Sequence, residues 1–325
     1  MKKQLVILFA LISFLGKSQN FEYQVLFEGI GDNREFFNDL AYPQTILGTR
    51  AAFETGVRFD NHRIRGGLSY LFEFGSDIDA QKPKLTLYYQ FKNENKEFLF
   101  GAFPRRDKID FPLAMLTDTL LYYRPNIEGM FGQLLWEWGH QYGFVDWISR
   151  QTDYNSEIFT AGTSGEIFAN NIFLQNYILM THDAIPGIRS PDEHIEDYLG
   201  FALQAGIRTR ENSAFDGYIK AGVLGSSFRQ RSVTDGYINA ASFFAEAKGK
   251  YRNFGLKSVL SSGGSHRFAY GDLFYRAKNY SRTDAIWYFI NHEKVKGIFN
   301  FSFHIIDWKE LNQQQQLSVI YVFGK

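Results

Sequence analysis

The chain has 325 residues, with 35 basic and 35 acidic side chains, no cysteine and an aromatic content of 18%. This balanced charge argues against a nucleic-acid-binding protein, which carries a strongly basic surface. The lack of cysteine excludes disulfides, thiolate metal sites and a lipid-modified N-terminal cysteine. The 33 Phe and 19 Tyr are heavy for a soluble domain of this size and favour a surface that meets lipid.

The first 18 residues are typical of a secretory signal peptide. Lys2 and Lys3 provide a basic start, and an apolar stretch follows at 5–15. This stretch is too short to span a bilayer as a helix, and no later apolar run is long enough to do so. We therefore expect a signal peptide at 1–18 and one membrane-embedded domain at 19–325, with a retained N-terminal anchor as the alternative.

Apolar and polar residues alternate along much of the chain with a period of two, which indicates strands. In one such segment, Leu68 and Phe72 lie on one face and Arg65 lies on the other. The clearest segments are 49–59, 64–74, 84–92, 295–305 and 317–323. Strands with one strongly apolar face predict a sheet that is exposed to lipid on that face.

The gaps between these strands are alternately short and long. Short polar gaps fall near 60–63, 93–96, 139–141, 168–170, 209–213, 252–253 and 292–294. Long gaps fall near 29–48, 75–83, 104–128, 153–156, 183–196, 224–237, 263–284 and 307–314, and they contain all seven prolines. The pattern predicts an all-β fold: a closed antiparallel transmembrane barrel of about 16 strands, within a range of roughly 14 to 18. Short turns and both termini should face the periplasm, and the long loops should be external.

Such a barrel must close, because lipid offers no hydrogen-bond partner to the backbone of an open edge. A barrel of this size encloses more space than its wall side chains fill, so the lumen should hold water. Charged residues are tolerated on that inward face. The ones expected there are Arg50, Glu54, Arg58, Arg65, Glu73, Lys92, Glu137, Lys220, Glu246, Lys248 and Lys257.

The third long gap, 104–128, is the most unusual segment of the chain. Its charged cluster comprises Arg105, Arg106, Asp107, Lys108 and Asp110, and an apolar stretch follows. With its strand count, loop order and signal peptide, the chain resembles the 16-stranded general porins of Gram-negative bacteria. The amino-acid sequence of 101–129 is most similar to that of uncharacterised outer-membrane barrel proteins of the Bacteroidota. The porin resemblance implies that the loop folds inward and that the cluster forms the pore constriction. An external loop with solvated charges is the alternative.

Two further residue groups suit the outer membrane. Candidates for aromatic girdles at the membrane interfaces, or for a sugar-stacking track in the lumen, are Trp136, Trp138, Trp147, Trp287, Trp308, Tyr122 and Tyr123. The acidic run comprises Asp192, Glu193, His194, Glu196 and Asp197, whose oxygens could bind Ca²⁺ or bridge lipopolysaccharide. Since the run lacks the spacing of an EF-hand loop, a solvated face is favoured, and we expect neither a metal nor a cofactor.

Enzyme motifs are weak in this chain. There is no GxSxG, HExxH or P-loop motif. Ser265 and His266 are adjacent, and adjacent residues of a strand point to opposite faces, so they would not form a nucleophile–base pair there. They could pair in a flexible loop, but a glycine-rich external loop is favoured. We therefore expect no catalytic residue and no enzyme.

The leading hypothesis for function is a porin-like outer-membrane channel for passive diffusion of small hydrophilic solutes. One alternative is a non-conducting assembly or binding barrel for surface polysaccharide or secretion. The other is a barrel-embedded lipid hydrolase with a serine and a histidine in contact at the outer rim. Expected partners are membrane lipid, lipopolysaccharide and small hydrophilic solutes, with no nucleic acid. Monomer and homotrimer are both open.

Overall fold

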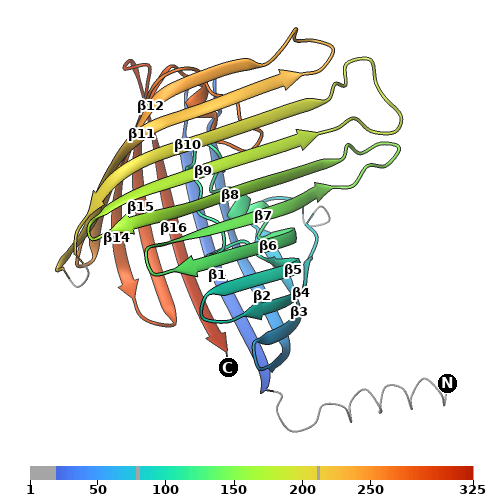
Figure 1. Ribbon diagram of the computed structural model, residues 1–325, viewed down its shortest axis with the longest axis vertical. Coiled ribbons are helices and arrows are strands. Elements are labelled where there is room, and N and C mark those ends of the chain that lie inside the picture. Colours follow the sequence, from blue (N-terminus) through green and yellow to red (C-terminus); the bar gives the residue numbers. More distant parts are fainter. Residues whose placement is uncertain (1–19, 78–80, 211–212, 325) are drawn as a thin grey trace.

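The computed structural model describes residues 20–77, 81–210 and 213–324, which form a closed antiparallel sheet (Figure 1). Its strands are β1 (Asn20–Glu35), β2 (Gln44–Phe59), β3 (His62–Glu73), β4 (Lys84–Lys92), β5 (Lys96–Pro104), β6 (Asn126–Trp136), β7 (Gly139–Ser149), β8 (Ile158–Ala169), β9 (Ile172–Asp183), β10 (Glu196–Arg208), β11 (Phe215–Gln230), β12 (Ile238–Tyr251), β13 (Phe254–Gly263), β14 (Asn279–Asn291), β15 (Val295–Ile306) and β16 (Glu310–Gly324). Each strand pairs with its neighbours in sequence, and β1 pairs with β16. The predicted closed barrel of about 16 strands is confirmed, while the predicted signal peptide lies outside the described residues.

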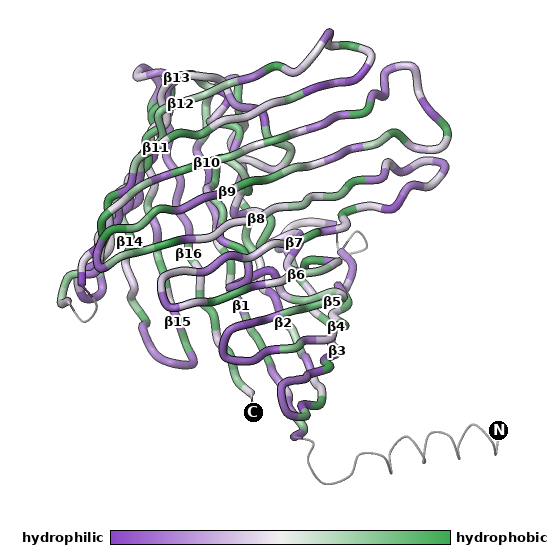
Figure 2. The backbone as a smooth tube through the Cα atoms, viewed as in Figure 1, coloured by the Kyte–Doolittle hydropathy of each residue, from purple (hydrophilic) through white to green (hydrophobic). Residues whose placement is uncertain are grey.

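The barrel wall separates an apolar outer face from a polar inner face. In β2, Leu47 and Phe53 are 48% and 49% exposed, whereas Arg50 and Glu54 are 4% and 8% exposed. Figure 2 shows hydrophobic and hydrophilic residues interspersed along the strands, as this alternation requires. So large an exposed apolar surface matches lipid rather than water. No helix in the described part of the chain is long and apolar enough to cross a membrane.

Several predicted loop boundaries are wrong, including those at 224–237 and 263–284, where β11 continues to Gln230 and β14 begins at Asn279. Two others have a clear physical reason. The first outer loop was expected from residue 29, but β1 continues to Glu35. Gly29 and Gly31 are strand residues facing Val319 and Leu317, because the pairing of β1 with β16 continues through both glycines. The last outer loop was expected at 307–314 but comprises only residues 307–309, because β15 ends at Ile306 and β16 begins at Glu310.

Gln313 and Gln314 of that predicted loop lie in β16 instead, together with the following Gln315 and Gln316. Gln314 is on the inward face, where its amide donates to Asp32 Oδ1 at 2.6 Å. Gln316 donates to Asp118 Oδ2 at 2.8 Å. A polar run can therefore form a strand here because the inner face offers hydrogen-bond partners.

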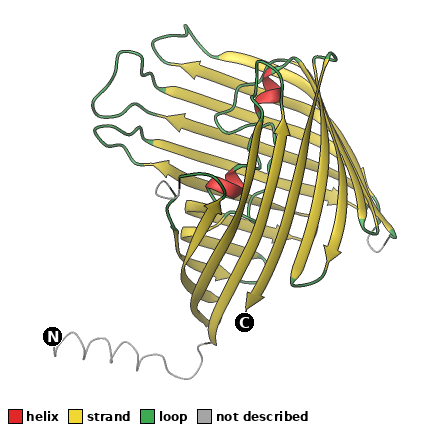
Figure 3. Cartoon of the chain, turned by 180° about the vertical axis from the view of Figure 1, so that it is seen from behind, coloured by secondary structure: helices red, strands yellow, loops and turns green. Residues whose placement is uncertain are grey.

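Three outer loops, 36–43, 105–125 and 264–278, fold inward and fill much of the lumen. They carry the short helix α2 (Leu120–Tyr123) and the 3-10 helix η2 (Leu273–Arg276), both surrounded by the wall of strands (Figure 3). Backbone hydrogen bonds join the two longer loops, from Thr117 N to Tyr270 O at 2.7 Å and from Asp272 N to Leu113 O at 2.8 Å. We call these three segments the plug. Its buried apolar side chains form one cluster with inward-facing wall residues.

The outward face yields a direct test. Leu203 lies at the middle of β10 and faces outward, and Leu199 faces outward nearer the external end. We expect Leu203→Arg to lower the free energy of unfolding in lipid vesicles by about 2–4 kcal/mol, and Leu199→Arg to cost distinctly less. Equal costs for the two variants would contradict a membrane midplane at this level.

Candidate functional site

Arg105 anchors the long plug loop rather than facing open space. It is 4% exposed, its Nε donates to Arg124 O at 3.0 Å, and its guanidinium pairs with Asp146 of β7. Asp146 Oδ1 also accepts the backbone N–H of Glu128 at 3.0 Å. Arg105 therefore ties both ends of the loop to the wall, and its charge is already neutralised.

The next two cations of the cluster attach the loop to two separate strands of the wall. Arg106 pairs with Glu28 of β1, and Lys108 pairs with Glu97 of β5. Both cations line a lumen cavity and are partly exposed. They face space that a solute could occupy, unlike Arg105.

The two aspartates of the cluster have different environments. Asp107 adopts a left-handed backbone conformation with φ of 64° and lines the same cavity. Asp110 is fixed through its backbone, whose N–H donates to Tyr142 Oη at 3.0 Å and whose carbonyl accepts from that hydroxyl at 3.1 Å. The five predicted constriction residues are thus divided between anchoring the loop and lining the cavity.

Two lumen cavities lie on either side of the plug along one part of the wall. The inner cavity, of about 570 Å³, extends to Lys294 in a short turn. The outer cavity, of about 470 Å³, extends to Gln81 in an outer loop. They share Arg50, Ser69 and Pro125 in their linings. The two spaces therefore approach each other at these three residues.

Arg50 occupies the boundary between these cavities. Its Nη1 donates to Glu28 Oε2 at 3.0 Å and to Leu121 O at 2.7 Å. Its Nη2 donates to the carbonyl of Tyr122. These contacts join the wall to α2 at the place where the two cavities approach each other.

The other predicted lumen residues mostly occupy inward positions of strands. These are Arg50, Glu54, Arg58, Arg65, Glu73, Lys92, Lys220, Glu246, Lys248 and Lys257. Glu137 is the exception, because it lies exposed in the turn between β6 and β7. That turn comes two residues earlier than the sequence pattern indicated.

A row of residues crosses the outward face near the outer ends of five strands. Direct cross-strand pairs join Trp147 to Phe159, Phe159 to His182, His182 to Asp197, and Asp197 to Arg229. The rings of Trp147 and Phe159 stack, with centroids 5.4 Å apart. We call these five residues the outer row. Aromatic and charged residues at one level of the outward face are typical of a membrane interface.

The predicted girdle residues are placed in different ways. Trp147 belongs to the outer row, while Trp136 and Trp138 lie together at a short turn. Tyr122 and Tyr123 lie in α2 within the plug, so they do not contribute to a girdle.

His182 and Asp197 form a hydrogen-bonded pair within the outer row. His182 Nδ1 lies 2.8 Å from Asp197 Oδ1, and Arg231 Nε donates to Asp197 Oδ2 at 2.7 Å. No residue in the described ranges bonds to Nε2 of His182. A histidine oriented at Nδ1 by a carboxylate can accept a proton through its other nitrogen. The pair therefore has the geometry of a general base that is partly exposed at the outer rim.

Sequence reasoning missed this pair, although a signal was present. In the sequence, Asp197 stands within the acidic run, and no motif singles out His182. The predicted gap at 183–196 already implied a hairpin in which residues 182 and 197 face each other. Applying that register to the ends of the strands identifies the pair.

The serine–histidine contacts within the described ranges lie inside the barrel. His266 Nδ1 is 2.9 Å from Ser226 Oγ, and its Nε2 is 2.8 Å from Ser242 Oγ. The imidazole is 1% exposed, and this burial lowers its pKa to about 4. His266 is thus a neutral link between the plug and the wall, with no access for a substrate.

The acidic run does not assemble a metal site. Glu193 accepts the backbone N–H of Ser190 at 2.7 Å, while Asp197 bonds to His182 and Arg231. Among the residues that the structure describes, no group of three or more His, Asp or Glu could hold a metal ion.

Comparison with known proteins identifies the family of this chain. A family model described as "Lipid A 3'-O-deacylase-type" matches residues 17–323. The chain belongs to this family. No curated protein matches it in sequence.

Solved structures with a similar fold are outer-membrane barrels. The outer-membrane expressed OmpT of Vibrio cholerae has a TM-score of 0.59 at 8% identity, covering 95% of this chain and 99% of that one. The outer membrane protein opdK of Pseudomonas aeruginosa has a TM-score of 0.51 at 9% identity, with coverages of 94% and 99%. OccAB3 of Acinetobacter baumannii has a TM-score of 0.53 at 11% identity, with coverages of 94% and 100%. At these identities the likeness concerns the fold, and the predicted outer-membrane location is confirmed.

Family membership corrects one sequence-based expectation. The chain was expected not to be an enzyme, and that expectation is wrong because the family is described as a deacylase type. The familiar hydrolase motifs are local in sequence, whereas His182 and Asp197 come together only through strand pairing. The absence of the local hydrolase motifs was therefore a poor guide to whether the chain is an enzyme.

The buried pair at the base of the plug gives a second prediction. Arg105→Met leaves Asp146 without its cation, so we expect a loss of about 3–5 kcal/mol in unfolding free energy and easier proteolysis of 105–125. Adding Asp146→Asn should recover part of this loss, because no unpaired charge then remains. Unfolding of single and double variants in detergent measures both effects. Wild-type stability in the Arg105→Met variant would contradict the anchoring role.

Proposed function

We propose that this barrel removes ester-linked acyl chains from a lipid A-type glycolipid in the outer leaflet, with His182 as the general base. The observation that carries the proposal is the His182–Asp197 pair on the outward face, in a chain of a deacylase-type family. The pair needs no open lumen, because its substrate would approach laterally through the membrane.

The level of the pair suits an ester bond of a membrane lipid. Trp147 and Phe159 extend from it along the outer row, and such aromatic residues prefer the boundary between hydrocarbon and headgroups. Acyl esters of a lipid lie at this same boundary. Arg229 packs over the ring of Tyr237 at 5.8 Å and makes no ion pair with any described residue. Its guanidinium is thus available to a lipid phosphate.

The proposed chemistry uses water as the nucleophile. His182 Nε2 takes a proton from water as its oxygen attacks the ester carbonyl carbon, while Asp197 stabilises the resulting imidazolium. The tetrahedral intermediate then expels the sugar oxygen, which receives the proton from His182. The products are a free fatty acid and the sugar hydroxyl. Arg231 holds Asp197 in place through two hydrogen bonds, at 2.7 Å and 3.1 Å.

Removing the base tests this assignment. His182→Ala should lower the rate of fatty-acid release from lipid A in mixed vesicles by about 10²–10⁴-fold, and Asp197→Asn should lower it as well. Mass spectrometry of the lipid products measures the release. The matched control is His292→Ala, which changes an exposed histidine in a short turn at the other end of the barrel.

Two results would count against the proposal in different ways. An active wild type whose His182→Ala variant keeps the full rate would remove His182 from the mechanism. A folded wild type that releases no fatty acid from lipid A would remove the activity itself.

We propose, as a second function, a narrow path for small hydrophilic solutes through the lumen. The supporting observation is that the inner and outer cavities share Arg50, Ser69 and Pro125. In this proposal the constriction consists of Arg50 together with the cavity-lining Arg106, Asp107 and Lys108. Arg105 and Asp110 support the loop that carries it.

Shortening Arg50 should widen this path. We expect Arg50→Ala to raise single-channel conductance in planar bilayers at least severalfold, because the contacts to Leu121 and Tyr122 are lost while Arg106 still pairs with Glu28. Arg58→Ala is the control, since that inward arginine is largely exposed at the inner end of β2. Sealed bilayers with both the wild type and Arg50→Ala would refute the path.

A further inference from the structure

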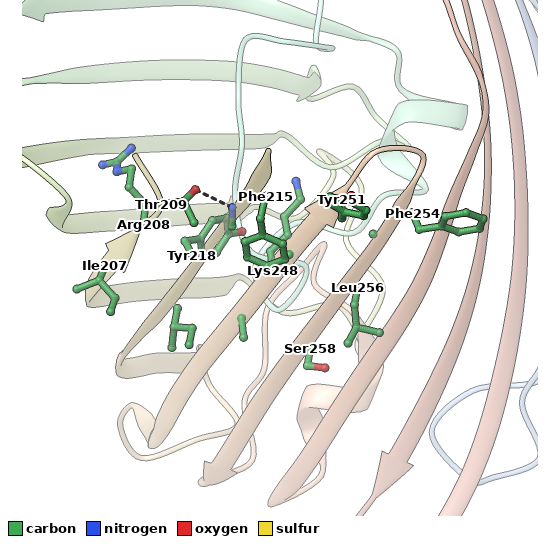
Figure 4. A pocket seen from close by; sticks show the side chains of 15 residues that line it. Ile207, Arg208, Thr209, Phe215, Tyr218, Lys248, Tyr251, Phe254, Leu256 and Ser258 are labelled. Atoms are coloured by element: carbon green, nitrogen blue, oxygen red, sulfur yellow. Dashed lines mark hydrogen bonds between the residues drawn. The ribbon is translucent and has the colours of Figure 1, made fainter. Parts of the chain in front are cut away.

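An apolar groove lies on the outward face of β10 to β13, next to their short turns (Figure 4). Its volume is about 640 Å³. The large side chains that line it are Ile207, Phe215, Ile219, Tyr251, Phe254 and Leu256. Each of these is at least half exposed, so none is satisfied by packing inside the protein. The groove is separate from the lumen and from the outer row.

Small residues make the groove deep. Gly217, Ala247 and Gly249 occupy neighbouring outward positions of β11 and β12 and line the groove. The ring of Phe215 lies across bare backbone here, since a Cβ at Gly249 would approach its Cζ to 2.6 Å. The floor is therefore backbone and one methyl group, and the walls are aromatic and branched aliphatic side chains. This shape suits a flexible hydrocarbon chain.

Cations lie at the short-turn end of the groove. Arg252 follows Tyr251 in the turn between β12 and β13, and its guanidinium lies 5.2 Å from the centre of that ring. Arg210, in the turn after β10, is also exposed. Because the short turns face the periplasm, these cations lie at the headgroup level of the inner leaflet. An apolar groove that ends at cations complements a lipid with an anionic headgroup.

We propose that this groove binds one acyl chain of an anionic glycerophospholipid from the inner leaflet, with the lipid phosphate held by Arg252. The position selects this occupant over the glycolipid of the proposed reaction, which would lie at the opposite end of the strands. The inference is independent of that reaction, since it involves different residues and a different leaflet.

Filling the groove tests the proposal. Ala247→Phe places a ring over the floor, and Ala245→Phe is the matched control because Ala245 faces outward on the same strand without lining the groove. Native mass spectrometry in detergent, after incubation with phosphatidylglycerol, counts the lipids retained by each barrel. We expect one tightly retained phosphatidylglycerol on the wild type and on Ala245→Phe, and none on Ala247→Phe. Arg252→Gln should weaken retention about fivefold, as expected for one basic residue at an anionic lipid.

Other outcomes would overturn the proposal. Equal retention by Ala247→Phe and the wild type would exclude the groove as the binding site. Equal retention of phosphatidylglycerol and phosphatidylcholine would exclude selection for an anionic headgroup, since both lipids carry a phosphate and only the first has a net negative charge. A wild-type dimer that Ala247→Phe dissociates would show that a second copy of the chain covers the groove instead. Preferential retention of lipid A would show that the groove binds a glycolipid and not a glycerophospholipid.

Discussion

The pairing of β1 with β16 is the constraint on which the rest of this structure depends. Twelve residues of each strand are in register, so the sheet has no open edge. In lipid an unpaired edge would leave backbone groups without partners, at a cost of several kcal/mol per group. Closure in turn fixes which side of every strand is outside, and a shift by one residue would expose Arg50 and Glu54 to hydrocarbon. The alternating pattern and the closed sheet therefore require each other.

Closure also creates a lumen that the wall alone does not fill. The plug solves this problem with apolar side chains such as Met115 and Phe274, which are almost fully buried. Ion pairs to the wall fix the direction of the long loop, with Arg106 and Lys108 reaching β1 and β5. Much of the space that remains lies along one side, where two cavities meet Arg50. Its dimensions are thus set by the loop, and the strand number alone does not determine them.

The period of the sequence was sufficient to predict the strand number, the closed barrel and most inward charges, because each depends on alternation within a single strand. The direction of the 105–125 loop could not be read in this way. Arg105 appeared to be a pore charge, yet its partner Asp146 is 41 residues away, and nothing local to either residue reveals the pair. Glu137 was placed in a strand because the turn between β6 and β7 was predicted at 139–141, whereas β6 ends at Trp136 and β7 begins at Gly139. Finding that His182 and Asp197 face each other requires the register between β9 and β10. The sequence indicates that register only through the position of the loop that joins the two strands.

The two faces of the wall place different demands on chemistry. Inside, charged groups are largely neutralised by neighbours, as for Glu246 between Lys220 and Lys257, and a buried imidazole such as His266 stays neutral. Such groups hold the plug and leave little reactivity. On the outward face His182 keeps one nitrogen free, and its substrate would arrive by diffusion in the plane of the membrane. A filled lumen is then an advantage, because a plug that braces the wall from within keeps the outward residues of adjacent strands in fixed positions. The feature that limits transport through this barrel would therefore favour catalysis on its surface.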